Sequence, residues 1–182
     1  MTGPRHHPLD AARMRRALAD LDSRLTTDVH LVIGGGAAMV LAYDHPLATQ
    51  DVDAFAKRGS PRVSELDPLA KQTARALDIE PDWLNAHFET FTYVLPADYS
   101  TRLRDVYAGR HLVVEALGPE DILVMKCFAA RDKDRPHAIK LARLSRDLAV
   151  VDRQLALLVE KRVAGAEKAA DYFDDLRDEL GL

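Results

Sequence analysis

A run of three glycines between two apolar segments constrains this chain more than any other feature. Residues 31–33 have strand character, residues 37–42 favour a helix, and Gly34, Gly35 and Gly36 lie between them. Glycine adopts positive φ values and places no side chain between the backbone and a ligand, so the first N–H groups of the helix can face a phosphate. The alternative is a loop that only lets the helix pack closely on the strand.

Two aspartates follow at strand-like spacing. Asp51 and Asp53 flank Val52, and because strand side chains alternate, both carboxylates point to the same face. Neighbouring carboxylates repel each other unless a cation lies between them, and oxygen ligands suit Mg²⁺ or Mn²⁺. Fifteen positions separate Gly36 from Asp51, which allows a helix of about three turns and a loop back to the glycines. The sequence predicts a metal site beside a phosphate site, the alternative being a solvated strand end.

These residues resemble the DNA polymerase β-like minimal nucleotidyltransferases, in particular the bacterial AbiEii toxin-like branch. A second matching segment lies downstream and contains Pro119, Glu120, Asp121, Ile122, Leu123, Lys126, Arg131 and Asp134. The resemblance covers residues 30–150 approximately and implies metal-dependent transfer of NMP from an NTP such as ATP to an acceptor. It assigns Asp51 and Asp53 as catalytic metal ligands. Gly34, Gly35, Gly36 and Thr49 would bind the nucleotide.

The chain departs from the pattern of this branch at three points. Leu47 stands where many relatives have arginine, and Gly36 stands where many have serine or threonine. The third carboxylate that often completes the site has no clear counterpart, and Glu115, near the end of a strand-like run, is the candidate catalytic residue. These departures leave open an alternative, in which the fold is catalytically inactive and acts as an antitoxin or a regulatory binding module.

Basic residues are concentrated in one stretch of the chain. Residues 126–146 contain seven Lys or Arg and two acids. Lys126 interrupts an apolar helical pattern, so its ammonium group needs a carboxylate or phosphate partner or must reach the surface. We predict that Lys126 acts in catalysis and that Arg131 binds the nucleotide. The stretch as a whole predicts either contact with the triphosphate or an RNA acceptor, or a solvated helix face. A partner protein and a small molecule such as an aminoglycoside are the other acceptors considered.

The pattern of elements predicts an α+β fold with a small mixed β-sheet flanked by helices. Residues 1–118 would form the nucleotidyltransferase-like core and residues 119–182 a helical portion packed on it, in one compact domain. Within this frame we expect a helix over residues 9–25 capped by Asp10, a helix over 63–77, and strands over 89–95 and 111–117. Asp152 is expected to cap a late helix.

Composition limits the remaining possibilities. The 182 residues are 47% apolar, which is enough for a sizeable core, and the single Cys127 is expected to pack in a helix without a disulfide. No segment approaches the ~20 apolar residues of a membrane span, so a soluble, cytoplasmic protein is expected. The histidines, including His30, His87 and His111, show no metal-ligand spacing, and no zinc site is predicted. The oligomeric state is not indicated.

Overall fold

The computed structural model describes residues 8–46 and 48–182, which form two compact units. The first unit contains residues 8–90 and Leu103–Leu117, and the second contains Phe91–Arg102 and Gly118–Leu182. Residues 91–102, which the sequence analysis included in the core, therefore cluster with the C-terminal helices. Leu47, where the resemblance points to an arginine in relatives, lies outside the described residues.

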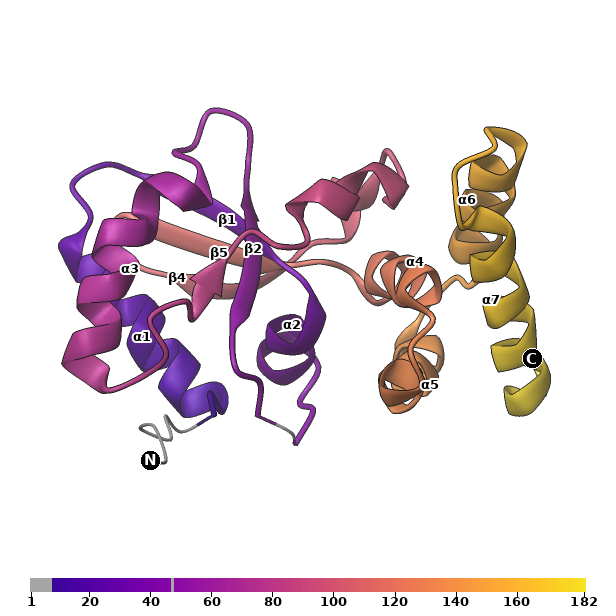
Figure 1. The fold of residues 1–182 in the computed structure, drawn as a ribbon, viewed down its shortest axis with the longest axis horizontal. Helices are drawn as coiled ribbons and strands as arrows, with labels where there is room; N and C mark the ends of the chain where they lie inside the picture. Colours follow the sequence, from indigo (N-terminus) through magenta and orange to yellow (C-terminus); the bar gives the residue numbers. More distant parts are fainter. Residues whose placement is uncertain (1–7, 47) are drawn as a thin grey trace, which may run out of the picture. The chain divides into compact units, whose positions relative to one another are not determined.

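A mixed five-stranded sheet is the centre of the first unit, with the strand order β3-β2-β1-β5-β4 (Figure 1). Its strands are β1 (Val29–Ile33), β2 (Val52–Ala56), β3 (Leu84–Asn85), β4 (Arg104–Ala108) and β5 (Leu112–Ala116). β1 is antiparallel to β2 and parallel to β5, while β2 is parallel to β3 and β4 is antiparallel to β5. The central strand β1 is almost wholly buried, which explains its apolar sequence.

The two faces of the sheet differ in exposure. Along β5, Leu112, Val114 and Ala116 are buried, whereas Val113 and Glu115 on the other face are half-buried. This alternation is the period of two that a strand with one covered face shows. The less covered face is the one on which polar side chains of β2 and β5 can meet a ligand.

Helix α1 (Ala11–Arg24) is fixed at both ends by aspartates. The Asp10 carboxylate caps its N-terminus by accepting the backbone N–H of Arg13 at 2.8 Å. Near its C-terminus, the Asp22 carboxylate accepts three backbone N–H groups from the β4–β5 turn at 2.7 to 2.9 Å. The donors are Arg110, His111 and Leu112. A helix residue therefore holds the hairpin that supplies two strands of the sheet.

Two more helices complete the first unit. Helix α2 (Gly35–Ala42) follows β1 directly and packs against β2, and α3 (Val63–Leu77) packs against α1 and β3. Trp83, fully buried just before β3, donates its indole N–H to the carbonyl oxygen of Ala70 on α3 at 2.9 Å. This bond fixes the point at which the chain enters β3, which places the following residues beside β2.

The second unit is helical. It is built from α4 (Pro119–Ala129), α5 (Arg135–Leu144), α6 (Ala149–Glu160) and α7 (Ala166–Leu180), with α4 packed against the other three. Short 3₁₀ helices are η1 (Glu89–Val94), η2 (Tyr99–Arg102) and η3 (Asp132–Asp134). Cys127 on α4 is fully buried, and burial raises its pKa to about 12, so it packs as a small apolar residue, as predicted.

The structure confirms the α+β prediction and corrects two details. Segment 89–95, predicted as a strand, contains the 3₁₀ helix η1, because its aromatic residues gave strand character without forming a ladder with a neighbour. The prediction that Asp152 caps a helix is also wrong. Helix α6 already begins at Ala149, and Asp152 lies inside its first turn, where a carboxylate is favoured by the helix dipole.

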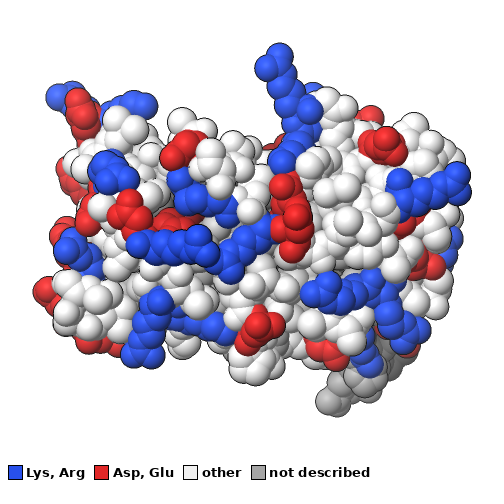
Figure 2. Space-filling view, turned by 180° about the vertical axis from the view of Figure 1, so that it is seen from behind, with Lys and Arg blue, Asp and Glu red and all other residues white. Residues whose placement is uncertain are grey.

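No helix in the described part of the chain is both long and apolar enough to cross a membrane. The face of the molecule drawn in Figure 2 carries Lys and Arg side chains interspersed with Asp and Glu side chains. This mixture agrees with the small formal net charge of −4.

Candidate functional site

The predicted aspartate pair lies at the start of β2. Asp51 directly precedes the strand and Asp53 is its second residue, and both are half-buried. The Asp51 carboxylate accepts a hydrogen bond from the Asn85 side-chain amide at 3.0 Å and a long one from the Thr49 hydroxyl at 3.5 Å. Both donors are neutral, so they orient the carboxylate without neutralising its charge.

A histidine joins the two aspartates. Ligand atoms of Asp51, Asp53 and His87 all lie within 4.8 Å of one another, and the three residues form a carboxylate–imidazole group able to hold a cation. His87 reaches this position because β3 pairs in parallel with β2, with Asp53 opposite Asn85. The pairing places β3 beside the start of β2, and His87 follows Asn85 by two residues. The arrangement has the donor types of a divalent metal site.

The glycine turn lies against this group. Gly35 has φ +55°, and a Cβ built there would be 3.7 Å from Oδ2 of Asp53, while the Gly34 N–H donates to the Asp53 carbonyl oxygen at 3.2 Å. Gly35 is the first residue of α2, and the first N–H groups of a helix have no acceptor within it. The structure therefore brings the start of α2 and the aspartate pair together, as the sequence analysis expected.

Gly36 and Thr49 are fitted to each other. A Cβ at Gly36 would lie 2.8 Å from the Thr49 hydroxyl oxygen, so a larger residue needs a shift of Thr49. Thr49 is itself fixed by two backbone hydrogen bonds with Leu9. The Leu9 N–H donates to the Thr49 carbonyl oxygen at 2.6 Å, and the Thr49 N–H donates to the Leu9 carbonyl oxygen at 3.0 Å. The absence of a serine or threonine at position 36 is thus explained sterically, because the Thr49 hydroxyl occupies that space.

Glu115 lies on the same sheet face as Asp53 but is directed elsewhere. It is opposite Val32 on β1, and its carboxylate pairs with Lys57 and His30, which lie one row further from Asp53 along the strands. Burial acts to raise the pKa of Glu115, but the bonds from Lys57 and His30 leave it below its usual value. Its role as the third carboxylate stays a prediction; the side chain found beside the aspartates is His87.

Lys126 and Arg131 belong to the second unit and share one carboxylate. The buried Lys126 ammonium group lies 2.6 Å from Oδ1 of Asp134, and Arg131 Nε lies 2.5 Å from Oδ2. Burial acts to raise the pKa of Asp134, but these two cations leave it below its usual value. The partner of the Lys126 ammonium group is therefore a carboxylate of the same unit. The catalytic role of Lys126 and the nucleotide-binding role of Arg131 remain predictions.

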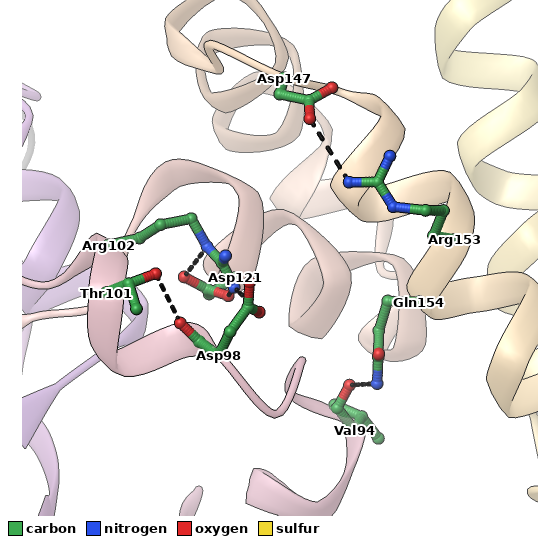
Figure 3. Close-up of polar contacts among 8 residues, drawn as sticks. All are labelled: Val94, Asp98, Thr101, Arg102, Asp121, Asp147, Arg153 and Gln154. Atoms are coloured by element: carbon green, nitrogen blue, oxygen red, sulfur yellow. Dashed lines mark hydrogen bonds and ion pairs between the residues drawn. The ribbon is translucent and has the colours of Figure 1, made fainter.

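Two other residues of the matched downstream segment also have structural partners, of which Figure 3 shows Asp121 with Arg102. The fully buried Asp121 carboxylate binds the Arg102 guanidinium through two bonds of 2.8 and 3.1 Å, and burial, the largest influence, raises its pKa. Glu120 accepts the backbone N–H of Arg146 at 2.7 Å. Gln154 on α6 donates to the carbonyl oxygen of Val94 at 2.8 Å. Within the second unit, Arg102 and Val94 thus tie residues 91–102 to the helices.

A comparison with protein families matches most of the chain. A family model described as "Nucleotidyltransferase of unknown function (DUF6036)" matches residues 12–166. The chain belongs to this nucleotidyltransferase family. The matched residues include the glycine turn, the aspartate pair and His87, and the family supports the superfamily resemblance while leaving the AbiEii-like branch a prediction. No curated protein and no solved structure shows a significant match to this chain.

Sequence reasoning missed His87 and Asn85. His87 was counted among histidines without metal-ligand spacing, whereas the structure places it beside Asp51 and Asp53. The reason is that 34 positions separate His87 from Asp53 and only the β2–β3 pairing brings them together. One local signal could have pointed to them. Asn85 and His87 have the same two-residue spacing as Asp51 and Asp53, and they follow directly after the buried Trp83 and Leu84.

Proposed function

We propose that this nucleotidyltransferase moves a nucleoside monophosphate from an NTP to an acceptor hydroxyl or phosphate, using Mg²⁺ or Mn²⁺. The observation that carries the proposal is the meeting of the start of α2 with the Asp51–Asp53 pair, through Gly35 beside Asp53. Phosphate groups favour helix N-termini, and divalent cations favour paired carboxylates. An NTP complexed with a divalent cation presents both groups together, so it is the substrate class that this pairing fits best.

In this proposal some residues supply charge, and others hold the substrate in position. Asp51 and Asp53 would hold the metal, which supplies charge neutralisation for the triphosphate and activation of the attacking oxygen. Backbone N–H groups at Gly35 and Gly36 would hold the phosphates. The acceptor oxygen forms a bond to the α-phosphorus, the bond from that phosphorus to the β-phosphate bridging oxygen breaks, and pyrophosphate leaves. Thr49, held by Leu9 and packed on Gly36, keeps the glycine turn at a fixed distance from Asp51.

The acceptor that we propose is RNA, with a partner protein as the second candidate to be tested in parallel. Support for RNA comes from the basic stretch, in which Lys133, Arg143 and Arg146 have exposed side chains in the second unit. We further propose ATP among the donors and a role in a toxin–antitoxin pair, both of which follow from the AbiEii-like resemblance. If the protein is such a toxin, its expression slows growth, and Asp53→Asn restores it.

The deciding experiment is transfer of label from each α-³²P NTP to total RNA and to protein in the presence of Mg²⁺ or Mn²⁺. The Asp51→Asn/Asp53→Asn variant should lose transfer, whereas Asp105→Asn, which changes an exposed aspartate on β4, should keep it. The proposal is supported if the parent and the Asp105 variant label RNA or protein and the double variant does not. The NTP that gives the label is then the donor. Absence of transfer together with absence of metal-dependent NTP binding contradicts it and favours the inactive binding module.

A further inference from the structure

We propose that His87 is the third protein ligand of the metal and that Asn85 positions it, giving a donor set that prefers a divalent transition ion such as Mn²⁺ to Mg²⁺. This inference rests on the proposed function, because it assumes that Asp51 and Asp53 hold the metal. It adds a residue and a metal preference that the family description does not contain.

The spacing of the three side chains fits one ion. Their ligand atoms lie within 4.8 Å of one another. Ligands about 2.1 Å from an octahedral ion are roughly 3.0 Å apart when adjacent and about 4.2 Å apart when opposite. The limit of 4.8 Å exceeds these spacings, so ligation requires a rotation of the exposed His87 side chain toward the aspartates.

Asn85 fixes two members of the group at once. Its side-chain nitrogen donates to Oδ2 of Asp51 at 3.0 Å, and its side-chain oxygen accepts the backbone N–H of His87 at 3.0 Å. The orientation of the amide is determined, because a carboxylate can only accept here and a backbone N–H can only donate. Asn85 is buried, with 9% of its surface exposed, so the side chain that connects Asp51 and His87 is itself shielded from solvent. Groups that orient metal ligands in this way tune metal affinity.

The imidazole changes which metal fits best. Mg²⁺ prefers oxygen ligands in a nearly ideal octahedron, whereas imidazole nitrogen binds transition ions more strongly. Mn²⁺ accepts carboxylate oxygen and imidazole nitrogen together. A third carboxylate would add charge and oxygen, which suit Mg²⁺, while His87 adds a neutral nitrogen. The group of Asp51, Asp53 and His87 therefore favours Mn²⁺ over Mg²⁺.

His111 offers a matched comparison in the same unit. Its ring Nδ1 lies 2.9 Å from Oδ1 of Asp28, and that pair is not part of a three-residue ligand group in the described structure. The exposed His87 thus lies beside two carboxylates, whereas the half-buried His111 pairs through its ring with one. Only the first arrangement is expected to bind metal, so His111→Ala serves as the control for His87→Ala.

The test measures Mn²⁺ binding without any reaction. Titration of the metal-free protein with Mn²⁺, followed by the electron paramagnetic resonance signal of the free ion, gives the affinity, and competition with Mg²⁺ gives the preference. His87→Ala should weaken Mn²⁺ binding at least about tenfold, and His111→Ala should leave it unchanged. His87→Asp should reduce the preference for Mn²⁺ over Mg²⁺ by about tenfold, because it restores an oxygen ligand.

A spectroscopic signature separates ligation from a structural effect. Electron spin-echo modulation from a coordinated imidazole ¹⁴N should be present in the parent protein and absent in His87→Ala. Asn85→Ala should weaken Mn²⁺ binding about tenfold and keep the ¹⁴N modulation on the metal-bound fraction, as expected for a positioning residue. Loss of the modulation in Asn85→Ala with unchanged affinity would overturn its positioning role.

The outcomes distinguish this inference from the proposed function. Mn²⁺ binding that requires Asp51 and Asp53 but is unchanged in His87→Ala, without ¹⁴N modulation, overturns the role of His87 and leaves the proposed function intact. Binding of neither Mn²⁺ nor Mg²⁺ to the parent protein overturns both. Binding that is lost in His87→Ala, retained in His111→Ala and accompanied by ¹⁴N modulation supports both.

Discussion

The aspartates of the two segments that resemble the family are used in opposite ways in the two units. In the first unit, Asp51 is hydrogen-bonded by neutral donors and lies with Asp53 and His87 in a group of ligand atoms. In the second unit, Asp134 and Asp121 are buried and paired with cations that belong to the same unit. The difference shows that a charged residue does not belong to a binding site merely because it lies in a family motif. The partners of each charge show whether it holds the fold together or is directed to a ligand.

The largest expected effect is on activity in the first unit. Asp51→Asn should lower the rate of nucleotidyl transfer about a thousandfold, equivalent to about 4 kcal/mol of transition-state stabilisation, because a neutral amide is a poor metal ligand. The free energy of unfolding should change by less than about 1 kcal/mol, since the asparagine oxygen can still accept from Asn85. Single-turnover rates and urea unfolding measure the two effects. A large loss of stability would break the comparison.

The next effect is on stability in the second unit. Arg102→Met should lower the free energy of unfolding by about 3 kcal/mol, because it leaves the fully buried Asp121 carboxylate without its cation. Asp121→Asn should cost much less, since it removes the charge that burial disfavours and keeps an acceptor for Arg102. Urea unfolding of both variants checks this order. Equal losses for the two variants would contradict the assigned cause.

A smaller effect is expected at Lys126. Lys126→Met should lower the free energy of unfolding by about 2 kcal/mol, because Asp134 keeps Arg131 as a partner after the change. NTP binding, followed by fluorescence of a labelled analogue, should be unchanged if the lysine is structural. If binding is lost while stability is kept, the catalytic role predicted from the sequence stands and the comparison between the units fails.

The smallest effect is a dependence of stability on pH. The pKa of Asp134 is lower in the folded protein than its usual value, so its ion pairs contribute fully above the unfolded pKa of about 3.9 and are lost as the pH falls through the folded value. The stability difference between the parent and Asp134→Asn should therefore shrink by about 1 kcal/mol between about pH 6 and about pH 3. Urea unfolding at several pH values measures it. A difference independent of pH would show that Asp134 acts through packing alone.

Local patterns were sufficient for much of the fold. The 3.6-residue periodicity and Asp10 predicted α1, the glycines predicted the β1–α2 turn, and the alternation around Val52 placed both aspartates on one strand face. These predictions held because each depends on residues within one or two turns of the chain. The strand predicted over residues 89–95 was wrong because a strand also needs a partner strand, which no local pattern indicates.

The sequence by itself determined the α+β class, the strand–turn–helix with its three glycines and the paired carboxylates, because backbone preference and side-chain alternation are local properties. Tertiary structure alone decided which charges became partners. Pairing of β3 with β2 brought Asn85 and His87 to the aspartates, and packing in the helical unit directed Lys126 to Asp134. These contacts join residues from different elements, and a side chain can meet a distant partner only after the sheet and the helices have assembled.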